Sequence, residues 1–253
     1  MKQSRRFKDH FSQVAVAYAA HRPTYPAALV DYLAGLAPAR RLAWDAGCGS
    51  GQLAVLLADA FERVVATDAS AEQIAQATAH PRVDYRRASA AASGLPAGVA
   101  DLAAAAQAAH WFDLPAYYAE VRRVARPGAI VALVSYGVVA AGPDLDAVIG
   151  PFYRGVLAAY WPPERWHVND GYRSLPFPFE ELEAPAFEIR REWQLADLVG
   201  YIGTWSAVWA LEQAAGPDRF ATFRRALATA WGGGPAATVR PVRWPLALRV
   251  GRV

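Results

Sequence analysis

The stretch with the clearest chemistry is LAWDAGCGSGQ, residues 42–52, in which an apolar run ends at Asp45 and three glycines follow at alternate positions. Glycine allows a tight turn and lets a ligand approach the main chain closely. A dinucleotide-binding turn of the form GxGxxG has glycine where this chain has Gln52, and the Asp45 carboxylate would repel a pyrophosphate. An acid there suits a positive group, such as the amino group of a methionine-like tail. The stretch therefore predicts a turn that binds a ligand with an amino-acid part.

A second acid, Asp68, ends the segment VVATDAS, 21 residues after Gly47. A carboxylate at the end of the second strand of a parallel sheet accepts hydrogen bonds from the two ribose hydroxyls of an adenosine. Together the two acids and the glycine turn favour S-adenosylmethionine over NAD as the ligand. The competing interpretation of the stretch is an ordinary strand-to-helix turn. Cys48 lies inside the motif, and we expect it to be a small packed residue and not a nucleophile.

These residues must be positioned by the strands and helices that alternate along the first half of the chain. Strands separated by helices predict a parallel sheet with right-handed crossovers, whose ligand lies beyond the carboxyl ends of the strands. Two helices at 7–20 and 26–37 precede the sheet. The expected core elements are strand 41–46, helix 51–60, strand 63–67, helix 71–79, strand 82–86, strand 101–106, helix 114–125 and strand 129–135.

The second half of the chain has a different texture. Aromatic and proline-rich sequence after about residue 137 predicts an insertion or lid, followed by a strand, two helices at 196–213 and 217–231, and a closing strand. The fold class expected is α/β, a Rossmann-like doubly wound sheet of seven mostly parallel strands with N-terminal helices and a helical, aromatic lid. We expect a single domain, 1–253, made of cap helices 1–40, a core 41–137, lid segments 138–186 and 196–234, and closing strands 187–195 and 236–250.

Several phrases carry a family resemblance. DAGCGSGQ, VVATDAS, VDYRRASAAASGLP, VADLAAAAQAAHWFD and EVRRVARPGAIVAL resemble, in order and spacing, the successive motifs of class I S-adenosylmethionine-dependent methyltransferases. AQAAHWFD, the opening YAAHRPTYP and the later YIGTWSAVWAL are similar to the type 11 branch that includes trans-aconitate methyltransferase-like proteins. The resemblance covers nearly the whole chain.

The resemblance implies a set of cofactor-binding residues. The glycine turn would lie under the methionine part, Asp45 would reach its amino group, and Asp68 would hold the ribose. Where similar proteins usually have an acid for the adenine, this chain has Ser89. The full set is Asp45, Gly47, Cys48, Gly49, Gly51, Asp68, Ala69, Ser89, Ala90, Gln107, Ala108 and Tyr18.

Candidate residues for contact with the methyl acceptor follow the fourth strand, or lie in the N-terminal cap helices and the lid. His110 is the candidate catalytic residue, as a general base, and His21 is a second candidate base. Packing against the helix at 114–125 is the alternative for His110. The tentative substrate residues are Arg22, Tyr25, Trp111 and Arg173, the arginines because a carboxylate acceptor needs a bidentate partner. The lid aromatics either wall the acceptor pocket or form the core of the insertion; they are Tyr153, Tyr160, Trp161, Trp166 and Tyr172.

Composition excludes several classes of protein. A single cysteine and five histidines without ligand spacing predict no metal site. Basic residues concentrate toward both ends of the chain, but no nucleic-acid-binding motif accompanies them, so no nucleic-acid partner is expected. No run of roughly 20 apolar residues and no signal peptide is evident, so we expect a cytoplasmic protein without membrane contact. Alanine and arginine richness favours a bacterial source, and the expected state is a monomer or homodimer.

The predicted function is methyl transfer from S-adenosylmethionine to a small-molecule acceptor. O-methylation is favoured, and a carboxylate is one candidate acceptor group. Alternatives left open are C- or N-methylation of a small metabolite and a non-catalytic protein that binds S-adenosylmethionine. An NAD-dependent dehydrogenase has the same architecture but is disfavoured by Asp45 and Gln52.

Overall fold

The computed structural model describes residues 23–232 and 238–253, so the helix expected at 7–20 lies outside the described residues. The elements, in chain order, are α2 (Ala27–Leu36), β1 (Leu42–Ala46), α3 (Ala54–Ala60), β2 (Arg63–Asp68), α4 (Ala71–Ala75), β3 (Val83–Arg87), β4 (Ala100–Ala106), the short turn η1 (Ala109–Trp111), α5 (Leu114–Val124), β5 (Ala125–Tyr136), α6 (Pro143–Pro151), the π-helical turn η2 (Phe152–Val156), η3 (Ala158–Tyr160), α7 (Arg165–Asn169), β6 (Glu180–Leu182), β7 (Glu188–Trp193), α8 (Leu195–Gly203), α9 (Ser206–Ala215), α10 (Asp218–Trp231) and β8 (Arg240–Arg252).

One sheet organises the fold. Seven strands follow the order β3-β2-β1-β4-β5-β8-β6, and β7 pairs separately with β8. The strands β3 through β5 are parallel, and β8 runs antiparallel to both β5 and β6. The expected α/β class with a mostly parallel seven-stranded sheet is therefore confirmed.

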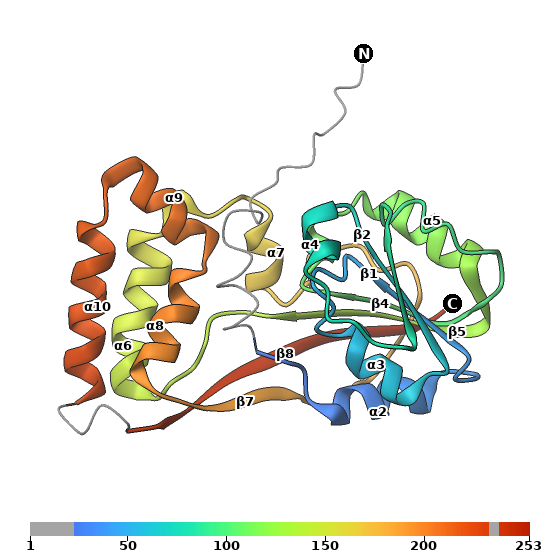
Figure 1. The fold of residues 1–253 in the computed structure, drawn as a ribbon, viewed down its shortest axis with the longest axis horizontal. Helices are drawn as coiled ribbons and strands as arrows, with labels where there is room; N and C mark the ends of the chain where they lie inside the picture. The colour runs from blue at the N-terminus through green and yellow to red at the C-terminus, as the bar shows by residue number, and fades with distance from the viewer. Residues whose placement is uncertain (1–22, 233–237) are drawn as a thin grey trace, which may run out of the picture.

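Helices cover both faces of this sheet (Figure 1). Along β1, Ala43 belongs to the apolar cluster shared with α2 and α3, whereas the next residue, Trp44, packs against Tyr117 of α5 with ring centroids 5.7 Å apart. Successive strand side chains point to opposite faces, so a run that is apolar at every position is buried on both sides. This is why the central strands contain few polar residues.

The crossover point of the sheet lies at β1. This strand pairs with β2 on one side and β4 on the other, and Asp45 is in register with Ala66 and Ala104. Connections leave in opposite directions on the two sides of such a strand, which opens a crevice beyond its carboxyl end. The glycine turn follows β1 at this crevice.

A separate group of helices stands beside the sheet. Figure 1 shows α6, α8, α9 and α10 side by side, joined to the core by the long β8 and by β7. One half of β8 pairs with β7 and the other half with β5, so a single strand serves both parts. None of the described helices is long and apolar enough to cross a bilayer; the longest, α10, has 14 residues.

Two expected elements differ from those observed. The helix expected over 196–213 is two helices, because α8 ends at Thr204, whose hydroxyl donates to the Tyr201 carbonyl at 2.6 Å, and Trp205 has an extended backbone. The segment 138–186, expected as an insertion or lid with no helix or strand placed in it, contains α6, η2, η3, α7 and the short β6. Frequent prolines and aromatics hid these short helices, since each is stabilised mainly by packing and not by helix propensity.

Candidate functional site

The carboxylate of Asp45 is buried at the end of β1. Neither oxygen has a hydrogen-bond partner among the described residues. Burial, and then the neighbouring negative charge of Asp68, raise the pKa of Asp45 to about 7. A buried carboxylate without a partner is costly, and an ammonium group placed beside it would remove that cost. The site therefore fits a ligand with an amino group at this position.

Asp68 connects β2 to the glycine turn. One of its oxygens accepts a hydrogen bond from the Gly49 N–H at 2.9 Å, and the other accepts from the Ser70 N–H at 2.8 Å. Burial raises the pKa of Asp68, and these backbone donors oppose the shift. Each carboxylate oxygen keeps a further lone pair, so the side chain can hold the turn and still accept from a ribose diol.

The three glycines of the turn all have positive φ angles, which non-glycine residues rarely adopt. A Cβ on Gly47 would lie 2.5 Å from the Ala108 Cβ, and one on Gly51 would lie 2.1 Å from the Tyr85 hydroxyl. A Cβ on Gly49 would meet no atom closer than 3.6 Å among the described residues. Packing inside the protein thus requires two of these glycines, whereas a Cβ on Gly49 would make only ordinary van der Waals contacts.

The residues expected around the adenosine lie together at the same edge of the sheet. The Ala88 N–H donates to the Asp68 carbonyl at 2.9 Å, so the segments that begin at Ala69 and Ser89 are neighbours. Ala69 and Ser89 are exposed, and Ala90 is half-buried. No acidic residue takes the place of Ser89 in this stretch of sequence.

A buried glutamate on α5 holds the loop that continues from Ser89. One oxygen of Glu120 accepts from both the N–H and the hydroxyl of Ser93, at 2.8 and 2.6 Å. Arg123 donates to Glu120 and to the Leu95 carbonyl at 2.7 Å. Hydrogen bonds from Arg123, together with those from Ser93, lower the pKa of Glu120 to about 2 against an opposing effect of burial. Sequence reasoning missed Glu120, which lies 27 residues from Ser93.

Gln107 ends β4 in a strained conformation. Its φ angle is 54°, its N–H donates to the Val134 carbonyl at 2.8 Å, and its side-chain amide donates to the Tyr136 carbonyl at 2.7 Å. Such strain persists only where surrounding contacts enforce it, and it is common at functional sites. The next residue, Ala108, is buried and approaches Gly47, so the ends of β1 and β4 meet here.

His110 lies one turn beyond Gln107, in η1. Its Nδ1 is 2.7 Å from the hydroxyl oxygen of Tyr172, and its ring packs against that of Trp111 with centroids 4.8 Å apart. Tyr172 is fully buried, and burial is the main cause of the raised pKa of its phenol. The phenol is therefore neutral, and it holds the imidazole in one orientation.

Tyr172 was predicted only as one of the lid aromatics. It is placed by a turn after α7, in which Gly171 and Tyr172 both have positive φ angles and the Tyr172 N–H donates to the His167 carbonyl at 2.7 Å. The NDG tripeptide before it is the local signal of that turn. Its partner His110 is 62 residues away, which no local pattern reveals.

Cys48 is buried, and its thiol donates to the Gly49 carbonyl at 3.5 Å. Burial, with the negative charges of Asp45 and Asp68, raises the pKa of this thiol, so it stays protonated. A protonated buried thiol is a weak nucleophile. Across residues 23–232 and 238–253, no group of three or more His, Cys, Asp or Glu side chains is placed to hold a metal ion.

The candidate substrate residues in the described part of the chain contact different partners. Arg173 is exposed and donates to a main-chain carbonyl of its own turn at 2.8 Å. Tyr25 is buried, with its ring 6.2 Å from that of Tyr136 at the end of β5. Tyr18 and Arg22 lie outside the described residues.

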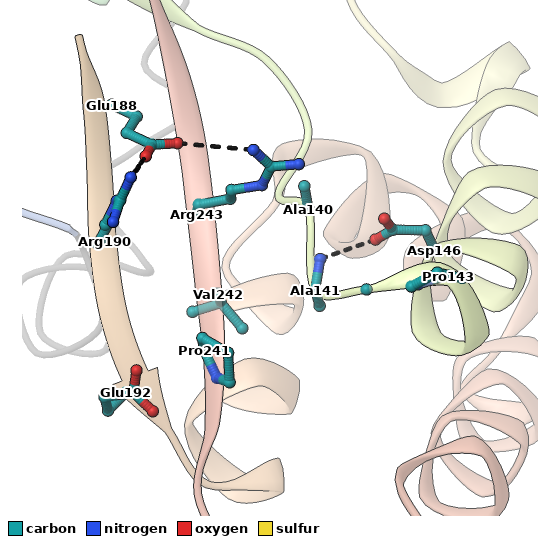
Figure 2. A pocket seen from close by; sticks show the side chains of 11 residues that line it. Ala140, Ala141, Pro143, Asp146, Glu188, Arg190, Glu192, Pro241, Val242 and Arg243 are labelled. Carbon is teal, nitrogen blue, oxygen red and sulfur yellow. Dashed lines mark hydrogen bonds and ion pairs between the residues drawn. The ribbon is translucent and has the colours of Figure 1, made fainter.

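A cavity of about 500 Å³ lies elsewhere, over the β7–β8 ribbon and the start of α6 (Figure 2). Glu188 forms ion pairs with Arg190 and, at 3.8 Å, with Arg243. Asp146 accepts from the Ala141 N–H at 2.8 Å. None of the predicted site residues lines this cavity, and these charged groups already have partners, so it is distinct from the crevice at β1 and β4.

Comparisons with known proteins agree with this geometry. Residues 44–133 match the model of a methyltransferase domain. A candidate methyltransferase of Dictyostelium discoideum is 32% identical over 230 residues, covering 89% of this chain and 88% of that protein. The solved structure of a candidate type II methyltransferase from Anaeromyxobacter dehalogenans is 52% identical, with a TM-score of 0.86 over 91% of this chain and 97% of that one.

A more distant structure supports the fold alone. A candidate methyltransferase from Bacillus halodurans is 18% identical, with a TM-score of 0.50 over 89% of this chain and 97% of that one. The family match spans β1 to β5, the part that carries both acids and the glycine turn. Since a 32% identical relative aligns along nearly its full length and the crevice fits an amino group beside Asp45, this chain belongs to the class I S-adenosylmethionine-dependent methyltransferases, with S-adenosylmethionine as its cofactor.

Proposed function

We propose that this methyltransferase methylates an oxygen of a small-molecule acceptor, and that a carboxylate is the acceptor group which its site suits best. The observation that carries the proposal is the hydrogen bond between His110 and Tyr172. A carboxylate is already ionised at neutral pH, so it needs a positioned donor and not a base.

The cofactor would be held along the carboxyl ends of the strands. Asp45 would accept from its amino group, Asp68 from its ribose hydroxyls, and Ser89 with the Ala90 backbone would contact the adenine. S-adenosylmethionine supplies a methyl group on a sulfonium, which is an activated leaving group. Gln107 and Ala108, together with the glycine turn, would line the side on which the acceptor meets the methyl group.

Tyr172 determines which nitrogen of His110 carries a proton. The hydroxyl oxygen of Tyr172 is close to the backbone N–H groups of Ala109 and His110, which lower its pKa and so act as donors to it. The hydroxyl proton of Tyr172 is then left to be donated to Nδ1 of His110. With Nδ1 of His110 accepting from Tyr172, the arrangement we propose has the ring proton on Nε2, where it is donated toward a carboxylate.

Alignment and exclusion of water are the remaining tasks of the chain. In-line methyl transfer is accelerated mainly by holding the reacting atoms along one axis. We propose that the protein is one domain in which segments 138–186 and 196–234 form a lid over the acceptor. The buried Tyr172 supports this arrangement, because it brings segment 138–186 against η1.

Calorimetry with S-adenosylhomocysteine and NAD tests the cofactor assignment. We expect binding of S-adenosylhomocysteine alone, and absence of that binding would contradict it. A panel of carboxylates, phenols, amines and quinone precursors, followed by release of S-adenosylhomocysteine, tests the acceptor. Turnover of carboxylates supports the proposal, whereas turnover of amines or carbon acceptors favours N- or C-methylation. Cofactor binding without any turnover favours a non-catalytic binding protein.

Narrower assignments are part of the same proposal. The type 11, trans-aconitate methyltransferase-like branch remains our preferred subgroup, on the strength of the AQAAHWFD and YIGTWSAVWAL phrases. Turnover of trans-aconitate in the same panel tests it. A bacterial, cytoplasmic protein that acts as a monomer or homodimer is the expected setting.

A further inference from the structure

We propose that Arg165, on α7, selects the acceptor by binding a carboxylate that lies away from the reacting oxygen. This inference rests on the proposed function, because it assumes that the acceptor occupies the crevice beside His110. It assigns the role of anion partner to a residue of segment 138–186 other than Arg173.

The side chain of Arg165 is held in one position by hydrogen bonds. Its Nε donates to the hydroxyl of Tyr153 at 2.9 Å, and that hydroxyl donates to Oδ1 of Asn169 at 2.7 Å. Tyr153 is buried, and Arg165 is half-buried. A guanidinium fixed in this way loses little conformational entropy when it binds a ligand.

Aromatic rings form the walls around this guanidinium. Its central carbon lies 5.1 Å from the ring centroid of Trp161 and 5.8 Å from that of Tyr153. Trp161 is itself held by donation from its indole N–H to the Tyr153 carbonyl at 3.1 Å. Rings of this kind stabilise a cation and exclude water from one side of it, which strengthens its attraction for an anion.

Arg165 forms no ion pair with a carboxylate in the described part of the chain, and only its Nε donates to an acceptor there. Two arginines of the core differ in this respect, since Arg123 pairs with Glu120 and Arg249 pairs with Glu181. Nη1 and Nη2 of Arg165 have no acceptor among the described residues. Their two N–H groups match the two oxygens of a carboxylate.

The helix that carries Arg165 places this residue near the proposed acceptor side of the site. Burial raises the pKa of the Tyr172 phenol, the positive charge of Arg165 opposes that shift, and the phenol oxygen is 2.7 Å from Nδ1 of His110. The helix α7, where Arg165 is the first residue, packs against η1 and β5. The anion site and His110 are thus on the same side of the crevice, joined through Tyr172.

Arg165 is suited to bind a second carboxylate of the acceptor, and not the carboxylate that receives the methyl group. A guanidinium that holds both oxygens of a carboxylate withdraws the electron density needed for attack on a methyl group. The reacting oxygen is therefore expected beside His110, with another carboxylate of the same molecule on Arg165. Acceptors with two or more carboxylates, or with one carboxylate and a separate nucleophilic oxygen, fit this arrangement.

Binding to the full-length protein saturated with S-adenosylhomocysteine tests the assignment. The probes are short mono- and dicarboxylates of increasing length, each beside its carboxamide analogue. We expect at least one dicarboxylate to bind to the wild-type protein, and Arg165→Gln to weaken its affinity roughly 10-fold to 100-fold, the loss typical of a charge-assisted bidentate contact. Arg165→Lys should recover only part of that affinity, and Arg173→Gln, on the same segment, should have no effect.

The outcomes separate this inference from the proposed function. Equal loss of affinity for a carboxylate and its carboxamide in Arg165→Gln would show a general packing defect and overturn the assignment. Failure of every dicarboxylate to bind the wild-type protein would overturn it as well, while binding of S-adenosylhomocysteine and carboxylate turnover would leave the proposed function intact. Loss of S-adenosylhomocysteine binding in the wild type would instead contradict the proposed function itself.

Discussion

The hydroxyl oxygen of Tyr172 lies 2.7 Å from Nδ1 of His110, and it connects the turn after α7 to the segment that follows β4. Replacing Tyr172 by Phe keeps the ring but removes the donor that fixes the imidazole. We expect turnover in Tyr172→Phe to fall roughly 10-fold, because the imidazole of His110 is then no longer held in one orientation. The measurement is kcat with the acceptor found in the panel.

Substitution of His110 itself distinguishes a donor from a base. A glutamine amide can donate from about the position of Nε2, so His110→Gln should retain a substantial part of the activity if His110 is a donor. If His110 were a general base, the activity of His110→Gln would instead fall roughly 10²-fold to 10⁴-fold. His110→Ala is the comparison that removes both roles, and equal activity of His110→Gln and His110→Ala would argue against the donor role.

The buried carboxylate of Asp45 predicts cofactor binding that depends on pH. Because the folded-state pKa of about 7 is above the unfolded value, the empty protein holds a proton on Asp45 below pH 7. Binding of an ammonium group requires the ionised form, so affinity for S-adenosylhomocysteine should fall as the pH drops below about 7, by up to roughly 10-fold per unit. Calorimetry in buffers of different ionisation enthalpy should detect the released proton.

A variant without that charge provides the control. Asp45→Asn should bind S-adenosylhomocysteine roughly 10-fold to 100-fold more weakly at neutral pH, and its affinity should vary less with pH. The same raised pKa means that ionised Asp45 destabilises the empty protein, a penalty that builds up as the pH rises from about 4 to about 7 and is constant above that. Asp45→Asn should therefore lose less stability than the wild type between about pH 4 and pH 7. An unchanged affinity would show that Asp45 does not meet the amino group.

Asp68 has two roles, and its variants separate them. Asp68→Ala should reduce affinity for S-adenosylhomocysteine roughly 100-fold or more, because hydrogen bonds to the ribose and the anchor of Gly49 are lost together. Asp84→Ala, which removes two surface ion pairs, with Arg63 of β2 and with Arg86 of β3, is the matched control and should leave affinity unchanged. Full affinity in Asp68→Ala would mean that the ribose lies elsewhere.

The glycine turn predicts a steric effect that does not depend on any ligand. Gly47→Ala would place a Cβ 2.5 Å from that of Ala108 at a φ of +68°, so we expect a loss of roughly 2 kcal/mol or more in the free energy of unfolding. Gly35→Ala is the control, since no atom of the described residues outside the adjacent backbone of α2 lies within 4 Å of its Cβ, and α2 should gain up to about 1 kcal/mol. Denaturant unfolding measures both, and equal stability of the two variants would contradict the packing argument.

The low pKa of Glu120 predicts that the loop beyond Ser89 becomes less stable as the pH falls. Its pKa is lowered from 4.5 to about 2, so its contribution is complete above about 4.5 and is lost as the pH falls toward 2. Glu120→Gln should cost on the order of 2 kcal/mol at neutral pH and little near pH 2. The variant should also weaken S-adenosylhomocysteine binding modestly by loosening this loop. Acid unfolding curves that run parallel for the variant and the wild type would exclude this role.

Local patterns in the sequence were sufficient for the core and for part of the candidate site. Strand and helix periodicity placed every strand from β1 to β5, and Ser70 and Asp113 begin α4 and α5 with the hydrogen bonds that cap residues make. The acids at 45 and 68 were identifiable because strand ends and glycine turns are local features. The roles proposed for them stay predictions until binding is measured.

Only the tertiary structure decided how distant segments complete the crevice. Tyr172 reaches His110 across 62 residues, Glu120 reaches Ser93 across 27, and Arg165 is held by Tyr153 while its charge acts on Tyr172. The sequence alone could not distinguish Arg173 from Arg165 as an anion partner, because exposure and hydrogen bonding are set by packing of the folded chain, and both assignments stay predictions. Periodicity and turn chemistry determine the elements, but contacts between segments far apart in the chain exist only once the elements have packed together.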